Sequence, residues 1–506
     1  MNTRNLSVIL ALIICVPLAI FVGVSAVQDQ IETVLMIGGV AFLIFCLMLG
    51  RHVWLLIPAT LGMQGSMNCL PGTPAPWQFM TAVTGGFFLL RWLTRRQLLR
   101  IRWTGMETAL LLVALTILQA FVRNPTGFAT FGGDLAGGRP YFQFAIAFAA
   151  FFLIAQANAD LRSWRWAVIA YIVFSLADGV IAFVGDLSPT FASVIIRYYS
   201  NVNFQAVHNL DYTSDIKDAR LGSLSFLAAP LGLIACSFWR PLTALNMRKP
   251  WRGLIALASV VLSLLGGSRS AFANLAVYFS LGSILRRKPL DVLLTAIVGF
   301  VVLAGLLVAL PTSTLPYSIQ RILTILPGLQ LRADVRQDAE GSNRIRFEMW
   351  ELVLSTDRYI KNKWLGDGFQ ISASELAARE ALMFGDSRGA GGMRQQDQLL
   401  AMGSYHGFHV ETIRFTGVLG LIAATGALIV FAVFASRCIR LYRGHPSWGY
   451  VLFIGMPFLI HPLWYWLVFG AYRSQFPVAI ALAGMIKLLY SMRLSEQIPA
   501  LNGSPG

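Results

Sequence analysis

The chain has 506 residues, of which 56% are hydrophobic and only 13% are charged, and its mean hydropathy is +0.64. A soluble domain carries about 25% charged residues, so this composition excludes an ordinary soluble protein and indicates an all-α protein embedded in a lipid bilayer. The net charge of +16 does not indicate a nucleic-acid partner, because the basic residues are divided among short connections between apolar runs.

Long apolar runs predict the transmembrane helices. A run of about 18 or more apolar residues spans a bilayer as a helix, because lipid leaves the backbone no other hydrogen-bond partner. We predict a polytopic bundle of twelve to fourteen spans, in which the short segment 53–66 is a candidate re-entrant helix. The predicted segments are 6–27, 34–50, 53–66, 77–93, 107–122, 141–158, 165–185, 221–239, 253–267, 269–286, 290–310, 409–435, 449–469 and 475–492.

Clusters of arginine and lysine predict the orientation. These clusters lie at 95–102, 240–252, 286–288 and 437–443. The short connections on the opposite side contain only Arg123, Arg139 and Arg473. By the positive-inside rule the clusters mark the cytoplasmic side, and an even number of spans places both termini there.

The predicted spans divide the chain into four parts. An N-terminal transmembrane bundle occupies residues 1–310 and contains an external loop at 186–220. A large external loop follows at 311–408, the C-terminal transmembrane helices occupy 409–492, and a cytoplasmic tail occupies 493–506.

The large external loop has helical signals of its own. Phe347, Trp350 and Val353 recur at helical spacing and predict a helix within 344–361. Ser372 followed by Glu375 is a capping-box pattern that predicts the start of a second helix. A charged, folded loop of this length is a typical carrier of function.

Two arginines lie at the predicted outer membrane boundary, where a charge is costly. Arg220 opens the helix at 221–239, and Arg269 stands between Ser268 and Ser270 in a tight turn between two apolar helices. Arginine binds phosphate with two parallel hydrogen bonds and stays charged, so these residues are candidate ligands for a lipid-linked diphosphate. The alternative is that each arginine is an interfacial anchor or pairs with an acidic residue such as Asp218.

Two histidines at the end of the large loop are candidate general bases. His406 and His409 stand at the predicted membrane boundary, and Glu411 follows within about one helical turn. An imidazole there is suited to take a proton from a sugar hydroxyl, and Glu411 is suited to orient it. The alternative is that His406 only caps or anchors the end of the helix.

Other signals are weaker. The sequence contains no zinc-protease, P-loop or dinucleotide-binding motif, so we expect no metal and no cofactor. Asp178 is the clear mid-span carboxylate and would serve as a proton relay if the protein were a secondary transporter or flippase. Trp464 and Trp466 flank the end of a helix and suit a membrane-interface belt better than a sugar-stacking surface.

Five short motifs in a fixed order resemble the superfamily of O-antigen ligases and O-antigen or exopolysaccharide polymerases, which are integral membrane glycosyltransferases. The resemblance covers about residues 215–436. The motifs are Arg220-Leu221-Gly222, Ser268-Arg269-Ser270, Arg346 four residues before Trp350, Leu365-Gly366-Asp367-Gly368-Phe369, and His406 eleven residues before Gly417. The chain departs from the family pattern at Gly407, where the family has Asn, Ser or Gln, and at Asp367, where it has a small apolar residue.

The resemblance implies a GT-C-like fold and a metal-independent, inverting glycosyl transfer at the periplasmic face of the bacterial inner membrane. The donor would be a glycan on undecaprenyl diphosphate, bound by Arg220 and Arg269, with Arg346 as a further candidate. His406 would activate the acceptor hydroxyl. The acceptor would be lipid A core for an O-antigen ligase-type enzyme, or a growing lipid-linked glycan for a polymerase.

Overall fold

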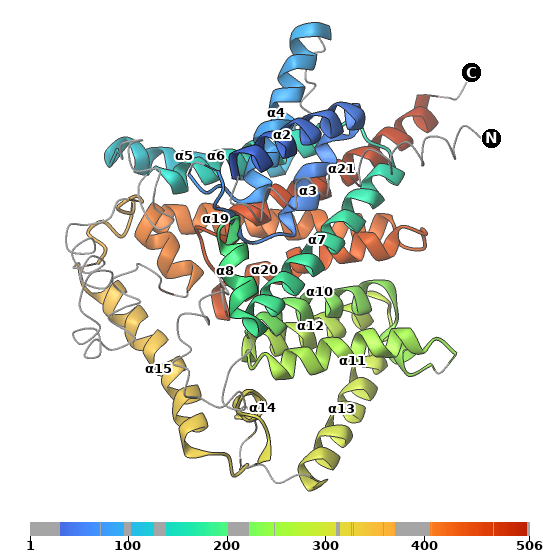
Figure 1. The fold of residues 1–506 in the computed structure, drawn as a ribbon, viewed down its shortest axis with the longest axis vertical. Helices are drawn as coiled ribbons and strands as arrows, with labels where there is room; N and C mark the ends of the chain where they lie inside the picture. The colour runs from blue at the N-terminus through green and yellow to red at the C-terminus, as the bar shows by residue number, and fades with distance from the viewer. Residues whose placement is uncertain are drawn as a thin grey trace. The chain divides into compact units, whose positions relative to one another are not determined.

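In a computed structural model, the described part of the chain is mostly helical and contains one pair of short strands (Figure 1). The structure describes residues 31–70, 72–95, 103–125, 138–200, 222–246, 248–309, 314–324, 326, 328–357, 359–369, 405, 407–468 and 470–502. The chain divides into two compact units, Met1–Val53 and Trp54–Gly506. Helix α2 (Ile31–Leu49) lies in the first unit, and a 3-10 helix, η1 (Gly50–Leu55), leads from the first unit into the second.

The second unit contains the remaining elements. The helices are α3 (Leu56–Leu61), α4 (Pro76–Arg95), α5 (Gly105–Arg123), α6 (Arg139–Ala155), α7 (Leu161–Leu187), α8 (Pro189–Ile196), α10 (Ser223–Phe238), η5 (Pro241–Leu245), α11 (Pro250–Leu265), α12 (Arg269–Leu285), α13 (Leu290–Ala309), α14 (Tyr317–Leu323), α15 (Ala333–Ser355), α19 (Phe408–Leu441), α20 (Trp448–Leu467) and α21 (Gln475–Asn502). The strands β1 (Ser66–Met67) and β2 (Tyr199–Ser200) pair antiparallel, with Ser66 opposite Ser200.

The prediction of an all-α polytopic protein is confirmed. Within the described residues, six stretches are long and apolar enough to cross a membrane: Gly38–Leu61, Gly105–Arg123, Leu161–Leu187, Phe408–Leu441, Trp448–Leu467 and Gln475–Arg493. Shorter apolar helices accompany them at Arg139–Ala155, Ser223–Phe238, Pro250–Leu265 and Leu290–Val301. The finer count of twelve to fourteen spans stays a prediction, and the first predicted span, 6–27, lies outside the described residues.

The observed helices can be compared with the predicted segments near the two ends of the chain. Helix α2 ends at Leu49, close to the predicted end of segment 34–50. Gly50 then adopts a φ of +52°, and η1 and α3 follow it in the region of the predicted segment 53–66. The candidate span Gln475–Arg493 matches the predicted segment 475–492, and helix α21 continues beyond it to Asn502, so most of the predicted tail at 493–506 is helical. At this end of the chain the helix is longer than the apolar run from which its end was predicted.

Aromatic rings fill the core where α6, α19 and α21 pack together. The ring of Phe144 in α6 lies 5.1 Å from that of Tyr472, and the ring of Phe408 in α19 lies 5.6 Å from that of Phe476 in α21. Phe369, which ends the Leu-Gly-Asp-Gly-Phe motif, is 1% exposed and stacks on Phe415 at 4.7 Å. The large loop is therefore anchored in the core of the helical bundle.

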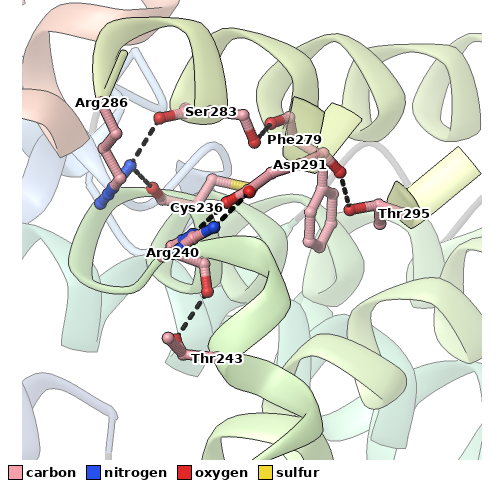
Figure 2. A network of polar contacts seen from close by, with 9 residues as sticks. Cys236, Arg240, Thr243, Phe279, Ser283, Arg286, Asp291 and Thr295 are labelled. Carbon is pink, nitrogen blue, oxygen red and sulfur yellow. Dashed lines mark hydrogen bonds and ion pairs between the residues drawn. The ribbon is translucent and has the colours of Figure 1, made fainter. Parts of the chain in front are cut away.

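Basic residues predicted to mark the cytoplasmic side also join the ends of α10, α12 and α13 (Figure 2). The Arg286 guanidinium donates to the carbonyls of Cys236 and Ser237, each at 2.7 Å. These carbonyls end α10 and have no partner within that helix, so Arg286 satisfies them. Arg240 forms an ion pair with the buried Asp291 carboxylate at the start of α13.

Candidate functional site

The turn that carries Arg269 is built by glycine and serine. Gly267 has a φ of +65°, which L side chains rarely adopt, and the Ser268 hydroxyl accepts a hydrogen bond from the Ala271 N–H at 3.4 Å. The Ser268 and Ser270 hydroxyl oxygens lie 3.0 Å apart. Arg269 is thus the first residue of α12, where the unpaired N–H groups of the helix favour an anion.

Arg269 extends from α12 to α15 in the large loop. Helix α15 begins at Ala333 and ends at Ser355, so it overlaps the predicted helix within 344–361 but begins earlier and ends earlier. The Arg269 Nη2 atom donates to the Ala339 carbonyl at 3.0 Å and to the Asn343 side-chain oxygen at 3.2 Å. Ala339, Asn343 and Arg346 follow one another at spacings of four and three, so they share one face of α15. The sequence-predicted residues Arg269 and Arg346 therefore face the same region.

A third arginine, Arg321 in α14, joins them. Its side chain is only 10% exposed, and its Nε atom forms an ion pair of 2.8 Å with Asp338 of α15. The Tyr317 hydroxyl donates to the same carboxylate at 3.0 Å. Arg321 was not among the predicted site residues, although its apolar neighbours Ile322 and Leu323 are a signal that this part of the chain is buried and that its charge needs a partner.

The three arginines act on one another electrostatically. Arg321 and Arg346 repel the charge on Arg269, whereas Asp338 attracts it. Burial lowers the pKa of Arg346, and the nearby Arg321 charge lowers it further. Arginine remains protonated despite such shifts. We call Arg269, Arg321 and Arg346 the arginine cluster. The Asp338 carboxylate pairs with Arg321 and attracts Arg269, whereas the charge that acts on Arg346 is that of Arg321, so the cluster has an excess of positive charge suited to an anion.

The predicted histidine region lies one turn farther along α15. The Trp350 indole N–H donates to the Tyr405 carbonyl at 2.7 Å, and the Trp350 ring lies 4.7 Å from the His409 imidazole. A side chain at Gly407 would meet the Trp350 ring at 2.9 Å, so this glycine permits the close approach. The short hydrophobic cluster of Met349, Val353, Ile360, Tyr405 and Val410 fixes α15 against the start of α19.

Arg220 and His406, the residues that the resemblance implies as diphosphate ligand and base, lie outside the described residues. Glu411 is described and is 3% exposed. Its carboxylate accepts a hydrogen bond of 2.8 Å from the Tyr472 N–H. No contact between Glu411 and His409 occurs in the described part of the chain, and the predicted orienting role of Glu411 stays a prediction.

The Leu-Gly-Asp-Gly-Phe motif has a structural role at a break in α19. Gly417 adopts φ +75° and ψ −177° inside the helix, which interrupts its hydrogen bonding. The loop supplies the missing partners, because Asp367 N–H donates to the Arg414 carbonyl at 2.9 Å and Val418 N–H donates to the Lys363 carbonyl at 2.8 Å. Asp367, where the chain departs from the family pattern, also faces the Arg414 guanidinium at 3.5 Å.

Asp178, the carboxylate on which the transporter alternative depends, has local partners. It accepts hydrogen bonds from the Tyr199 hydroxyl and, at 3.4 Å, from the Gln64 N–H. The Tyr199 hydroxyl in turn accepts from the Gly65 N–H at 2.8 Å. These contacts tie α7 to the β1–β2 strand pair and account for a buried carboxylate without a transported ion.

Comparison with models of protein families found no match, and neither did comparison with curated protein sequences. The resemblance to the ligase and polymerase superfamily therefore rests on the motif residues alone. Of those residues, Arg269 and Arg346 lie close enough to interact electrostatically. Arg321, which is not a motif residue, joins them, and Trp350, with His409 against it, lies one helical turn farther along α15.

Proposed function

We propose that the protein is a membrane glycosyltransferase of the O-antigen ligase type, with a GT-C-like arrangement. It moves a glycan from an undecaprenyl-diphosphate-linked donor to an acceptor hydroxyl at the periplasmic face of the bacterial inner membrane. The single observation that supports this most is the arginine cluster at the start of α12. An excess of guanidinium charge there suits the two phosphates of a lipid-linked donor.

The reaction needs a stabilised leaving group and a base. The acceptor oxygen attacks the anomeric carbon, the bond from that carbon to the diphosphate oxygen breaks, and undecaprenyl diphosphate leaves with the bonding electron pair. The arginine cluster and Arg220 stabilise the charge that develops on this diphosphate. His406 takes the proton of the acceptor hydroxyl, with His409 as the alternative base. Attack from the face opposite the diphosphate inverts the anomeric centre.

The acceptor distinguishes the ligase from the polymerase of the same superfamily. The test mixes purified protein with an undecaprenyl-diphosphate-linked oligosaccharide in EDTA, with and without lipid A core, and resolves the products by mass. Glycan attached to the core supports the ligase, and longer lipid-linked glycans formed without core support the polymerase. Unchanged donor under both conditions would contradict the proposal.

Substitutions test the arginine cluster in the same assay. Arg269→Ala and Arg321→Ala should each lower transfer about ten- to hundredfold, the range expected for one charged hydrogen-bonding group. Lysine at position 269 should restore transfer only in part, because the ammonium group is a point charge and cannot replace the bidentate hydrogen bonding of the guanidinium. The matched control is Arg344→Ala, since Arg344 lies on α15 two residues before Arg346 but is 80% exposed and pairs with Glu348. Equal activity in all three alanine variants would remove the support for the proposal.

A further inference from the structure

Four rings form a continuous row across three helices. Phe347 and Trp350 of α15 lie 5.4 Å apart, and Trp350 lies 4.7 Å from His409 of α19. His409 stacks on Trp466 of α20 at 5.7 Å, with 15° between the ring planes. We call these four residues the aromatic wall.

The exposed end of the aromatic wall faces water. Phe347 is 65% exposed, and the residues next to it along α15 are charged. Arg344 and Glu348 on either side of it form an ion pair of 3.1 Å with largely exposed side chains. A helix with such neighbours is not immersed in lipid, so burial in the bilayer does not explain the exposed phenylalanine.

The aromatic wall begins beside the arginine cluster. Phe347 follows Arg346 directly, and Trp350 stands four residues beyond Arg346, which is about 6 Å along a helix. A ligand with an anionic group at the cluster would therefore place its next part against these rings.

We infer that the aromatic wall binds the sugar rings nearest the diphosphate of the donor. This inference depends on the proposed function and adds the glycan subsite to it. One face of a pyranose ring presents C–H groups with partial positive charge, which pack on the negative face of an aromatic ring.

The test compares two ligands in nanodiscs: undecaprenyl diphosphate, and the same lipid diphosphate carrying an oligosaccharide. Phe347→Ala should weaken binding of the oligosaccharide-linked lipid about two- to tenfold, the range expected for one aromatic contact, and leave undecaprenyl diphosphate unchanged. Phe347→Tyr should restore binding, whereas Phe347→Leu should not, because leucine keeps the apolar surface and loses the ring. Trp364→Ala is the matched control, since Trp364 is 68% exposed in the same loop and outside the wall.

The outcomes separate the two proposals. Loss confined to the oligosaccharide-linked lipid supports the glycan subsite. Unchanged binding of both ligands overturns the subsite, and equal loss of both ligands overturns it in favour of a contact with the lipid interface. If wild-type protein fails to bind undecaprenyl diphosphate, or if Arg269→Ala binds it as wild type does, the proposed function itself is overturned.

Discussion

The N–H of Val418 donates a hydrogen bond of 2.8 Å to the carbonyl of Lys363, which lies 55 residues earlier in the chain and belongs to a different element. This bond replaces one that a continuous α19 would make within itself. It is possible because Gly417 turns the backbone into a conformation that is open almost only to glycine. The large loop thereby supplies hydrogen-bond partners to the backbone of α19.

Gly417→Ala should destabilise the protein. The backbone conformation alone costs about 1–3 kcal/mol for a residue with a side chain, and the new methyl group would collide with the Trp364 carbonyl. Thermal unfolding of the detergent-solubilised protein measures the loss. The control is Gly426→Ala in the same helix, where a methyl group meets nothing within 4 Å. Equal melting temperatures for the two variants would contradict the role of the break.

Asp367→Asn should also destabilise the loop. The carboxylate accepts from the Lys361 N–H at 2.8 Å and the Asn362 N–H at 3.0 Å. An amide directs an N–H group toward one of these donors, so we expect a cost of about 1–3 kcal/mol, measured by thermal unfolding. Asp357→Asn is the control, because that carboxylate is 83% exposed and its pairing with Lys363 contributes little. A melting temperature no lower than that of the control would show that Asp367 is dispensable.

Arg287→Gly should stabilise the end of α12. Arg287 has a φ of +56°, and the Lys288 N–H donates to the Ser283 carbonyl at 3.0 Å, which is the helix ending that prefers glycine. Removing the side chain relieves about 1 kcal/mol of backbone strain. Arg287→Ala removes the same charge and keeps the strain, so only the glycine variant should melt at a higher temperature. A rise in both variants would assign the effect to charge.

Lys487→Met should be strongly destabilising, because it leaves the buried Glu107 carboxylate without its ion-pair partner. Breaking such a pair costs about 3–5 kcal/mol. Adding Glu107→Gln should recover most of the loss, since glutamine is neutral and still caps the N-terminus of α5 through the Thr104 N–H. Chemical or thermal unfolding of the single and double variants measures this recovery, and a double variant as unstable as Lys487→Met would refute it.

The helices were predictable from sequence because apolar length and basic flanks are local properties. The apolar segment 269–286 predicted α12, and the helical periodicity of Phe347, Trp350 and Val353 predicted α15, while the capping-box pattern at Ser372 lies outside the described residues. The ends of helices were less predictable, since α21 continues past its apolar run to Asn502. There the backbone hydrogen bonds continue into polar sequence.

The candidate site was predictable only in part. The tight turn at Arg269 and the motif order indicated it, but the contact of Arg269 with Asn343 joins segments 74 residues apart. Arg321 was missed because α14 has only seven residues, too few to show a periodic pattern. Arg321 is identified as a site residue only in the folded structure, where Asp338 and Arg269 lie beside it.

The break in α19 also has a consequence for biogenesis. Helix α19 leaves the membrane-insertion machinery with unpaired N–H and C=O groups at Gly417, and lipid offers them no partner. The loop that provides the partners, residues 363–368, is synthesised first and is already available when α19 is inserted. The hydrogen-bond partners of the break in α19 are therefore synthesised before the break itself. A circular permutant that reversed this order would insert α19 while these backbone groups are still unpaired.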